Sequence, residues 1–212
     1  MVTQKTKIMM EYLNSIDTQL FLFLNGKHNA FFDPLMYWLS DKLVWVPMYL
    51  LIAFFIVKNY KMNGIVMLLF VGIVIALCDQ TASHLIKNTV LRLRPSHEPS
   101  LIGMVHLSKA GAGGMYGFVS SHAANAFGLA TFLYCTLGGS FNILKYWLFI
   151  WAVLVSYSRI YNGVHYPGDV LVAALIGTFI GWVISKLFFI VENKRLKTHG
   201  RSLLGSNIDR KI

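Results

Sequence analysis

Five long apolar runs constrain the fold of this chain more than any other feature of its sequence. The runs cover residues 43–57, 64–86, 123–139, 146–161 and 170–191. An α-helix that crosses a bilayer needs about 20 mostly apolar residues, and the runs approach or exceed that length. The chain is 56% hydrophobic and 13% charged, against about 25% charged in a typical soluble domain. The sequence therefore predicts an all-α, polytopic membrane helical bundle with about five spans.

Residues 1–42, ahead of the first run, show a different pattern. Their apolar residues are interrupted by the polar residues 25–29 and by Asp33-Pro34. Tyr37 and Trp38 suit the level of the lipid headgroups. We expect N-terminal amphipathic helices that lie at the membrane interface, with a sixth span as the alternative.

Linker composition predicts a single domain. No stretch rich in Pro, Gly or Ser divides the chain, and we expect one membrane domain over residues 1–191. The basic and polar residues 192–212 are expected to form a solvated cytoplasmic tail. We expect no removable signal peptide, because no short apolar segment is followed by a cleavage site.

Five spans also determine which connections share a face of the membrane. The tail shares one face with two links, 58–63 and 139–145, and the opposite face holds the loop 87–121 and the turn 159–169. Lys and Arg residues close to the helix ends of the first face indicate the cytoplasm. We therefore expect a multi-pass protein of a bacterial inner (cytoplasmic) membrane, with its long loop facing the periplasm or the outside.

The formal net charge of +10 raises the question of a nucleic-acid partner. Many of the Lys and Arg residues sit at the ends of apolar runs instead of forming one continuous face. A membrane protein that handles an anionic substrate explains this distribution better. We expect a lipid bilayer and a membrane lipid phosphate as partners, and no nucleic acid. Nothing in the sequence indicates an oligomeric state.

Ionisable groups at the ends of membrane helices are costly and are candidates for function. Lys87 and Arg94 close the second run, seven residues apart, which predicts that both lie on one side of a helix that Pro95 ends. Residues 120–122 begin the third helix, where free N–H groups and the helix dipole favour an anion. Taken singly, the first cluster is explained by snorkelling side chains and the second by an ordinary helix cap.

A third cluster lies around the turn between the last two runs. Arg159 ends the fourth run, His165 sits in a turn rich in Gly and Pro, and Asp169 begins the fifth run. A carboxylate four residues from a histidine can accept a hydrogen bond from one ring nitrogen and leave the other nitrogen nucleophilic. A helix cap beside an interfacial histidine is the alternative.

The expected topology brings the three clusters to the same face of the membrane. Together they supply three cations, a helix N-terminus, two histidines and one carboxylate. Phosphoryl transfer uses such a set, because cations and N–H groups neutralise the phosphate oxygens while a base or nucleophile acts in line. No cluster of carboxylates offers a Mg²⁺ site, so we expect neither a metal nor another cofactor.

In order, these stretches resemble the signature of the type 2 phosphatidic acid phosphatase family, whose relatives include vanadium haloperoxidases. The first family motif, Lys-x6-Arg-Pro, is matched in full over residues 87–95, and the third, Ser-Arg-x5-His-x3-Asp, in full over residues 158–169. The second, Pro-Ser-Gly-His, is matched at Ser120 and His122, with Val and a second Ser in place of Pro and Gly. The resemblance implies a type 2 phosphatidic acid phosphatase/haloperoxidase-like core.

The resemblance also implies a role for each matched residue. His165 would attack phosphorus and become a transient phosphohistidine, oriented and activated by Asp169. His122 would protonate the leaving oxygen and then activate water. The remaining matched residues would hold the phosphate oxygens: Lys87, Arg94, Ser120 and Arg159.

Four further residues are candidates for a supporting shell or for contact with the lipid headgroup: Arg92, Ser121, His84 and His97. His84 falls on one helical face with Gln80 and Lys87 and could help to hold Lys87, although hydrogen bonding between helices is the commoner use of such residues. Arg92 can equally be a surface arginine. The glycine-containing loop 96–117 is a candidate headgroup lid, with an irregular solvent loop as the alternative.

Together these features predict an integral-membrane phosphatase, a hydrolase that removes a phosphomonoester or diphosphate group from a membrane lipid. Candidate substrates are a lipid A phosphate, undecaprenyl diphosphate, phosphatidylglycerophosphate and phosphatidic acid, with a slight preference for lipid A or undecaprenyl carriers. A lipid-to-lipid phosphotransferase is one alternative. A transporter or lipid-binding protein that uses the same basic site without turnover is another.

Overall fold

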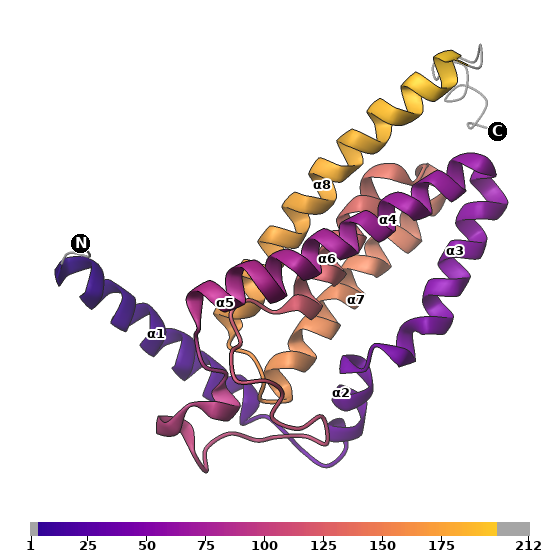
Figure 1. Ribbon diagram of the computed structural model, residues 1–212. Coiled ribbons are helices and arrows are strands. Elements are labelled where there is room, and N and C mark those ends of the chain that lie inside the picture. Colours follow the sequence, from indigo (N-terminus) through magenta and orange to yellow (C-terminus); the bar gives the residue numbers. More distant parts are fainter. Residues whose placement is uncertain (1–3, 199–212) are drawn as a thin grey trace.

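The computed structural model describes residues 4–198 of the chain (Figure 1). Over this part the regular secondary structure is helical, and an isolated antiparallel bridge joins Leu93 to Tyr116. The α-helices in chain order are α1 (Gln4–Asn25), α2 (Phe32–Ser40), α3 (Val46–Tyr60), α4 (Met62–Gln80), α5 (Lys87–Val90), α6 (Ser121–Thr136), α7 (Asn142–Tyr161) and α8 (Pro167–Thr198). The expected all-α class is confirmed.

Four helical stretches are long and apolar enough to cross a membrane: Leu43–Tyr60, Met62–Val90, Gly139–Tyr161 and Pro167–Arg195. They correspond to four of the five expected spans, so the expected polytopic membrane bundle is confirmed. The fifth expected span is α6, whose 16 residues give a length of about 24 Å. Ten of those residues are buried, so neighbouring helices surround most of α6.

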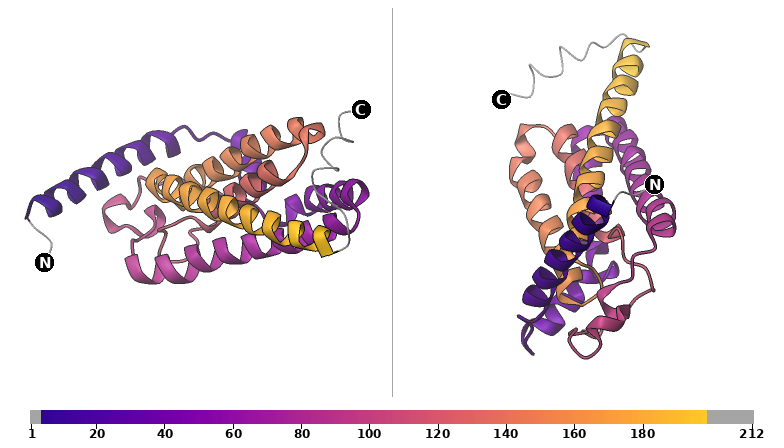
Figure 2. Two further views of the ribbon diagram at one scale, coloured as in Figure 1. Left: turned by 90° about the horizontal axis from the view of Figure 1, so that it is seen from above. Right: turned by 90° about the vertical axis from the view of Figure 1, so that its left-hand side faces the viewer.

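α6 lies in the middle of the bundle, where it packs against α4, α7 and above all α8 (Figures 1 and 2). A Cβ atom added at Gly177 of α8 would collide with the backbone of Ala124 on α6, and one added at Gly181 would collide with that of Gly128. Small residues four apart on both helices let two membrane helices pack backbone to backbone. We call this contact, made by Ala124, Gly128, Gly177 and Gly181, the glycine seam.

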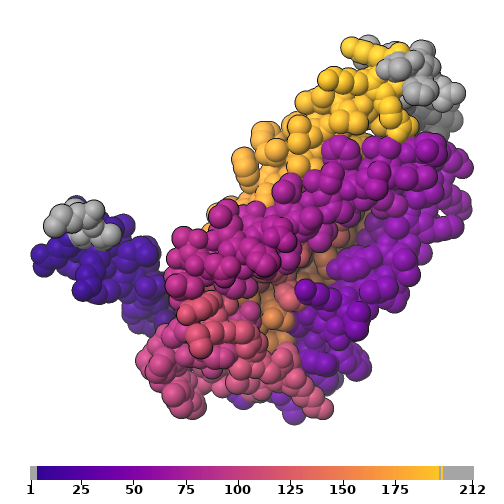
Figure 3. Space-filling view, viewed as in Figure 1, coloured from indigo at the N-terminus to yellow at the C-terminus, as the bar shows by residue number. Residues whose placement is uncertain are grey.

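The outer faces of the bundle carry large apolar side chains. The buried residues of α3 are Ile52 and Ile56, whereas Leu50, Leu51 and Phe54 are exposed. The surfaces of α3, α4 and α8 form one broad side of the molecule (Figure 3). A monomeric soluble protein rarely exposes so much continuous apolar surface, and these faces are suited to contact with lipid chains.

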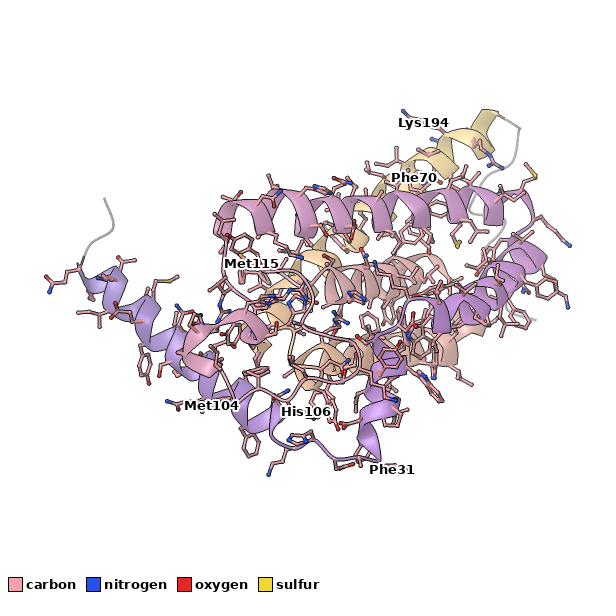
Figure 4. The ribbon with its side chains drawn as sticks, turned by 60° about the horizontal axis from the view of Figure 1, so that its bottom comes forward. Phe31, Phe70, Met104, His106, Met115 and Lys194 are labelled. Carbon is pink, nitrogen blue, oxygen red and sulfur yellow. The ribbon has the colours of Figure 1, made fainter. Side chains whose placement is uncertain are left out.

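The helix connections gather at two ends of the bundle (Figures 1 and 4). One end holds the α3–α4 and α6–α7 links and the C-terminal part of α8, which carries Lys194. The other end holds the segment 91–120, with Met104, His106 and Met115, and the α7–α8 turn. This alternation brings all three charged sequence clusters to the same end of the bundle, which we call the loop end.

The N-terminal segment forms a longer helix than the sequence pattern indicates. α1 is a continuous helix of 22 residues that projects from the bundle at the loop end (Figures 1 and 2). It is not one of the four candidate spans, and its exposed apolar side chains include Ile8, Leu13 and Phe23. α2 follows as a separate short helix packed on α7.

The other departure concerns the C-terminal segment. α8 continues as a regular helix through Thr198, so residues 192–198 of the expected solvated tail are helical. Arg195 in this extension donates a hydrogen bond to Asn63 at the start of α4, 3.0 Å away, which ties the helix end to the bundle. Residues 199–212 of the expected tail lie outside the described residues.

Candidate active site

The candidate nucleophile lies in the turn before α8. His165 is 2% exposed and Asp169, in the first turn of α8, is 0% exposed. His165 Nδ1 and Asp169 Oδ2 are 3.4 Å apart, and the backbone N–H of Tyr166 donates to the same carboxylate oxygen at 3.0 Å. A carboxylate that orients one ring nitrogen fixes the tautomer of a histidine and directs the other nitrogen outward.

Three cations converge on this imidazole. Burial lowers the pKa of His165 well below its ordinary value, and Arg94, Arg159 and Lys87 lower it further by repelling a proton. These cations come from three separate segments: Arg159 from the end of α7, Lys87 from the start of α5, and Arg94 from the extended segment after α5. His165 is therefore neutral at neutral pH, the state that a nucleophile needs.

Lys87 and Arg94 reach the site from different elements, so the expectation of one helix through Arg94 is wrong. The helix ends at Val90 because Leu91 adopts a left-handed conformation with φ 51°. The chain then runs extended and pairs with the end of the long loop. Arg94 N donates to Met115 O at 3.0 Å.

Glycines make room for the Arg94 side chain. A Cβ atom at Gly113 would overlap its guanidinium group, and one at Gly117 would lie 3.0 Å from its Cγ and 3.2 Å from Asp169 Oδ2. Arg94 Nε also donates to Tyr116 O at 3.1 Å. The sequence suggested that glycines here give a lid its mobility, but in the structure two of them let the loop close around an arginine.

The head of α6 joins the same site. Ser120 is its N-cap and is fully buried, and its Oγ accepts from Ala123 N at 3.5 Å. The Ser120 N–H donates to the backbone oxygen of Asp169 at 3.3 Å, which links α6 directly to α8. His122, half-buried in the first turn of α6, has Arg159, Lys42 and Arg94 among its charged neighbours.

Arg159 enters from the end of α7. Its Nη1 donates to Ser40 Oγ of α2. Its Nε is buried and has no hydrogen-bond partner within residues 4–198. A buried N–H without a partner is unfavourable, and here it is available to an anionic ligand.

A cavity of about 670 Å³ adjoins these groups between α3, α4, α6 and α7. Most of its lining is apolar, and one end carries polar side chains that include Asp41, Lys42, Asp79, His122 and Asn125. Pockets of several hundred Å³ with a few convergent polar groups are typical ligand sites. His122 thus lies between the apolar cavity and the cations.

The structure places the four candidate supporting residues differently. Ser121 Oγ shares a 2.7 Å hydrogen bond with Ser83 Oγ, and His97 Nδ1 one of 3.1 Å with Ser96 Oγ. Arg92 binds carboxylates, including Asp169, at 2.8 Å. His84 is exposed, and its side chain makes no hydrogen bond or ion pair with another described residue.

The position of His84 has a local cause. Residues Thr81–Ile86 form a π-helix, η2, whose wider turn changes the angular spacing along the helix. The regular-helix face on which His84 would support Lys87 is therefore not formed. The structure gives no direct contact between the side chains of His84 and Lys87, and a supporting role for His84 stays a prediction.

Sequence reasoning missed a group of residues that fasten the long loop. Asn25, at the end of α1 and 1% exposed, donates to Tyr161 O at 2.8 Å and to His106 O at 3.0 Å, and it accepts from His106 N at 2.8 Å. His106 Nε2 lies 2.9 Å from Asp33 Oδ1, and its ring stacks on His28 with centroids 3.8 Å apart (Figure 4). The polar residues that interrupt the N-terminal apolar pattern were the available signal.

Comparison with known proteins assigns the chain to the integral-membrane enzymes that hydrolyse phosphate esters. The sequence pattern of the PAP2 superfamily matches residues 63–192. The chain belongs to this superfamily, which is the type 2 phosphatidic acid phosphatase family that its motifs resemble, and the expected class of membrane lipid phosphatase is confirmed.

Two curated relatives match most of the chain. The lipid A 4'-phosphatase of Bacteroides thetaiotaomicron is 39% identical over 188 residues, which are 88% of this chain and 81% of that protein. The lipid A 4'-phosphatase of Porphyromonas gingivalis is 35% identical over 190 residues, 88% of this chain and 79% of that protein. Among solved structures, Aquifex aeolicus LpxE is similar with a TM-score of 0.58 and 27% identity, covering 80% of this chain and 94% of that one.

Proposed function

We propose that the protein removes a phosphate group from a membrane lipid through a phosphohistidine formed on His165. The observation that carries the proposal is the convergence of three cations on a buried His165–Asp169 pair beside an apolar cavity. Neutral imidazole, phosphate-neutralising cations and room for a lipid chain are the three requirements of this chemistry.

The first step is an in-line attack. A ring nitrogen of His165 forms a bond to phosphorus while the bond from phosphorus to the lipid oxygen breaks. The negative charge of the bound phosphate offsets the cations around His122, which are Arg159, Lys42 and Arg94. His122 is then protonated and gives its proton to that oxygen, so that the lipid leaves as a neutral alcohol. The neighbouring cations and the N–H groups at the head of α6 neutralise the other phosphate oxygens.

The second step regenerates the enzyme. Water attacks the phosphohistidine, and His122, now neutral, takes a proton from that water. The bond between phosphorus and nitrogen breaks, inorganic phosphate leaves, and His165 returns to its neutral state. Asp169 holds the imidazole in one orientation through both steps.

The favoured substrate is a lipid A phosphate. Support comes from the two relatives named lipid A 4'-phosphatase, each of which matches 88% of this chain. The acyl chains would lie in the cavity between α3 and α4 on one side and α6 on the other. Undecaprenyl diphosphate, phosphatidylglycerophosphate and phosphatidic acid offer the same combination of apolar chain and phosphate.

The proposed location is a bacterial inner membrane, with the loop end facing the periplasm. Lys58 in the last turn of α3, Lys61 between α3 and α4, and Lys194 of α8 lie at the opposite end of the bundle. Excess Lys and Arg near helix ends marks the cytoplasmic side. The lipid phosphate would then be removed in the outer leaflet.

Phosphate release by the purified protein tests the proposal. The four lipid phosphates are offered in detergent micelles with EDTA present, and free inorganic phosphate is measured. We expect release from at least one of them, and at least about a 10³-fold lower kcat for H165A, as found when a nucleophile is removed. I143A, a change at an exposed residue at the start of α7, at the end of the bundle opposite the loop end, is the control and should retain activity.

Three results would contradict the proposal. Labelled phosphate that appears on a second lipid, without free phosphate, would indicate a phosphotransferase. Lipid binding without turnover in the wild type, unchanged in H165A, would indicate a binding protein or transporter. Complete loss of activity in EDTA would overturn the metal-free mechanism.

A further inference from the structure

A guanidinium group behind the catalytic pair connects it to the N-terminal helix. Arg92 Nη1 lies 2.8 Å from Asp169 Oδ1, and Nη2 lies 2.8 Å from Asp17 Oδ2 of α1. The guanidinium also sits 4.0 Å above the ring centroid of Tyr166. Arg92 and Asp17 are mostly buried, with side chains 20% and 15% exposed. Charge-assisted contacts of this length in a shielded place are strong and directional.

Asp17 has a second contact at the same place. Its Oδ1 accepts from the backbone N–H of Gly168 at 2.7 Å, in the first turn of α8. A Cβ atom at Gly168 would lie 2.6 Å from Asp17 Oδ2, so the absence of a side chain there makes room for the carboxylate. Asp17 therefore touches the residue before Asp169 and the cation that binds Asp169.

We infer that Asp17 is a positioning residue for the catalytic pair, acting through Arg92. Asp17 occupies one terminal nitrogen of Arg92, so that Arg92 engages Asp169 through the other nitrogen and through Oδ1. Oδ2 is then left to face His165. Without the Asp17 carboxylate, both nitrogens of Arg92 would turn to Asp169 and compete with His165 for it, since bidentate pairing of a guanidinium with a carboxylate is favourable.

This inference rests on the proposed function and extends it to α1, which lies outside the superfamily match over residues 63–192. It gives α1 a role besides contact with the membrane surface. The hydrolytic site is complete only when this N-terminal helix is docked on the start of α8.

The test is a set of steady-state measurements on full-length protein in detergent. D17N keeps the oxygen that accepts from Gly168 and removes the charge that binds Arg92. We expect kcat to fall about 10- to 100-fold, since displacements of about 1 Å at a reacting group have effects of this size, with KM within about twofold of the wild type because the phosphate-binding groups are untouched. E11Q, on the same helix and paired with Lys7 at its exposed surface, is the matched control and should keep its kcat.

A double-mutant cycle separates positioning from a general effect on folding. In an R92Q background, D17N should lower kcat no further, because the cation through which Asp17 acts is gone. D17E keeps the charge and should recover part of the lost kcat. Thermal unfolding in detergent is measured for every variant.

Unchanged kcat in D17N would overturn the inference. So would an equal loss of kcat on adding D17N to R92Q, or a D17E variant less active than D17N, because a structural contact would then explain the effect. A failure of the proposed function would give a different result from a failure of this inference. In that case H165A would keep full phosphate release, whatever the effect of substituting Asp17.

Discussion

α6 and α3 are both apolar helices beside the cavity, yet they meet different neighbours. Ten of the 16 residues of α6 are buried, whereas α3 buries Ile52 and Ile56 among its 15 residues. The first half of α6 is rich in Ala and Gly, and α3 is rich in Leu, Ile and Phe. Apolar character alone indicates that a helix belongs in a membrane. Side-chain size indicates whether protein or lipid lies beside it.

The two helices also serve different parts of the proposed reaction. The head of α6 carries Ser120 and His122 and is locked to α8, which carries Asp169, by the glycine seam and by the backbone bond from Ser120 to Asp169. α3 lines another side of the cavity with Tyr49, Ile52, Ala53 and Ile56, and most of its other large side chains are exposed. In the proposed reaction the catalytic residues therefore lie on the closely packed helices α6 and α8, and the lipid chain binds on the loosely packed side, beside α3.

This contrast predicts that a mutation at the glycine seam lowers stability and activity together. G177L would force α8 away from the backbone of Ala124 and separate Asp169 from the head of α6. Overpacking costs about 1–3 kcal/mol in ordinary cores, and a clash with backbone should lie at the upper end of that range. We expect an earlier thermal unfolding transition in detergent and at least about a 10²-fold lower kcat in whatever protein folds.

A glycine on the loosely packed side provides the control. A Cβ atom at Gly72 of α4 meets no atom within 4 Å, so G72L adds the same bulk without a clash. If G177L unfolded no earlier than G72L, the seam would not be the rigid part of the molecule and the contrast between the two sides would fail.

The glycine seam could be predicted from the sequence, because its small residues are spaced four apart, as Ala124 with Gly128 and as Gly177 with Gly181. Hydropathy and charge clusters were sufficient to predict the fold class and the face on which the motifs meet. Both predictions depend on the composition of the runs and on the alternation of spans between the two sides of the membrane. Neither depends on contacts between side chains.

The parts that sequence reasoning missed depend on backbone geometry and long-range pairing. The π-helix Thr81–Ile86 and the left-handed Leu91 change the direction of the chain after α4, and no periodicity in residues 81–94 signals either one. Asp17 and Asn25 become meaningful only when α1 is docked beside residues far along the chain, Asp17 beside Gly168 and Asn25 beside Tyr161. Their polarity was visible, but their partners were not.

G72L also tests the proposed place of the lipid chain, with a smaller effect. Gly72 lines the cavity, and a leucine there would take up part of its volume. We expect KM for a long-chain lipid phosphate to rise about tenfold, equivalent to about 1.4 kcal/mol of lost binding, with kcat and the KM for a short-chain, water-soluble phosphate ester unchanged. L69A, at an exposed position of the same helix, is the control. An equal rise in KM for both substrates would place the lipid chain elsewhere.

The smallest expected effect is a shift in the pH dependence of activity, which reports how closely the cations surround His165. Burial and three cations lower the pKa of His165 from an ordinary value of about 6.5, and the nucleophile must be neutral. The acidic limb of kcat/KM should therefore lie below that pH in the wild type. R94Q removes one repelling charge and should move the limb to higher pH, although not fully to the ordinary value, because burial is the larger cause.

The substrate phosphate titrates in the same range, so the two proteins are compared on one substrate and its contribution cancels. A limb that stayed in place or moved to lower pH in R94Q would show that Arg94 does not act on the imidazole, and would remove one of the three cations from the proposed phosphate site.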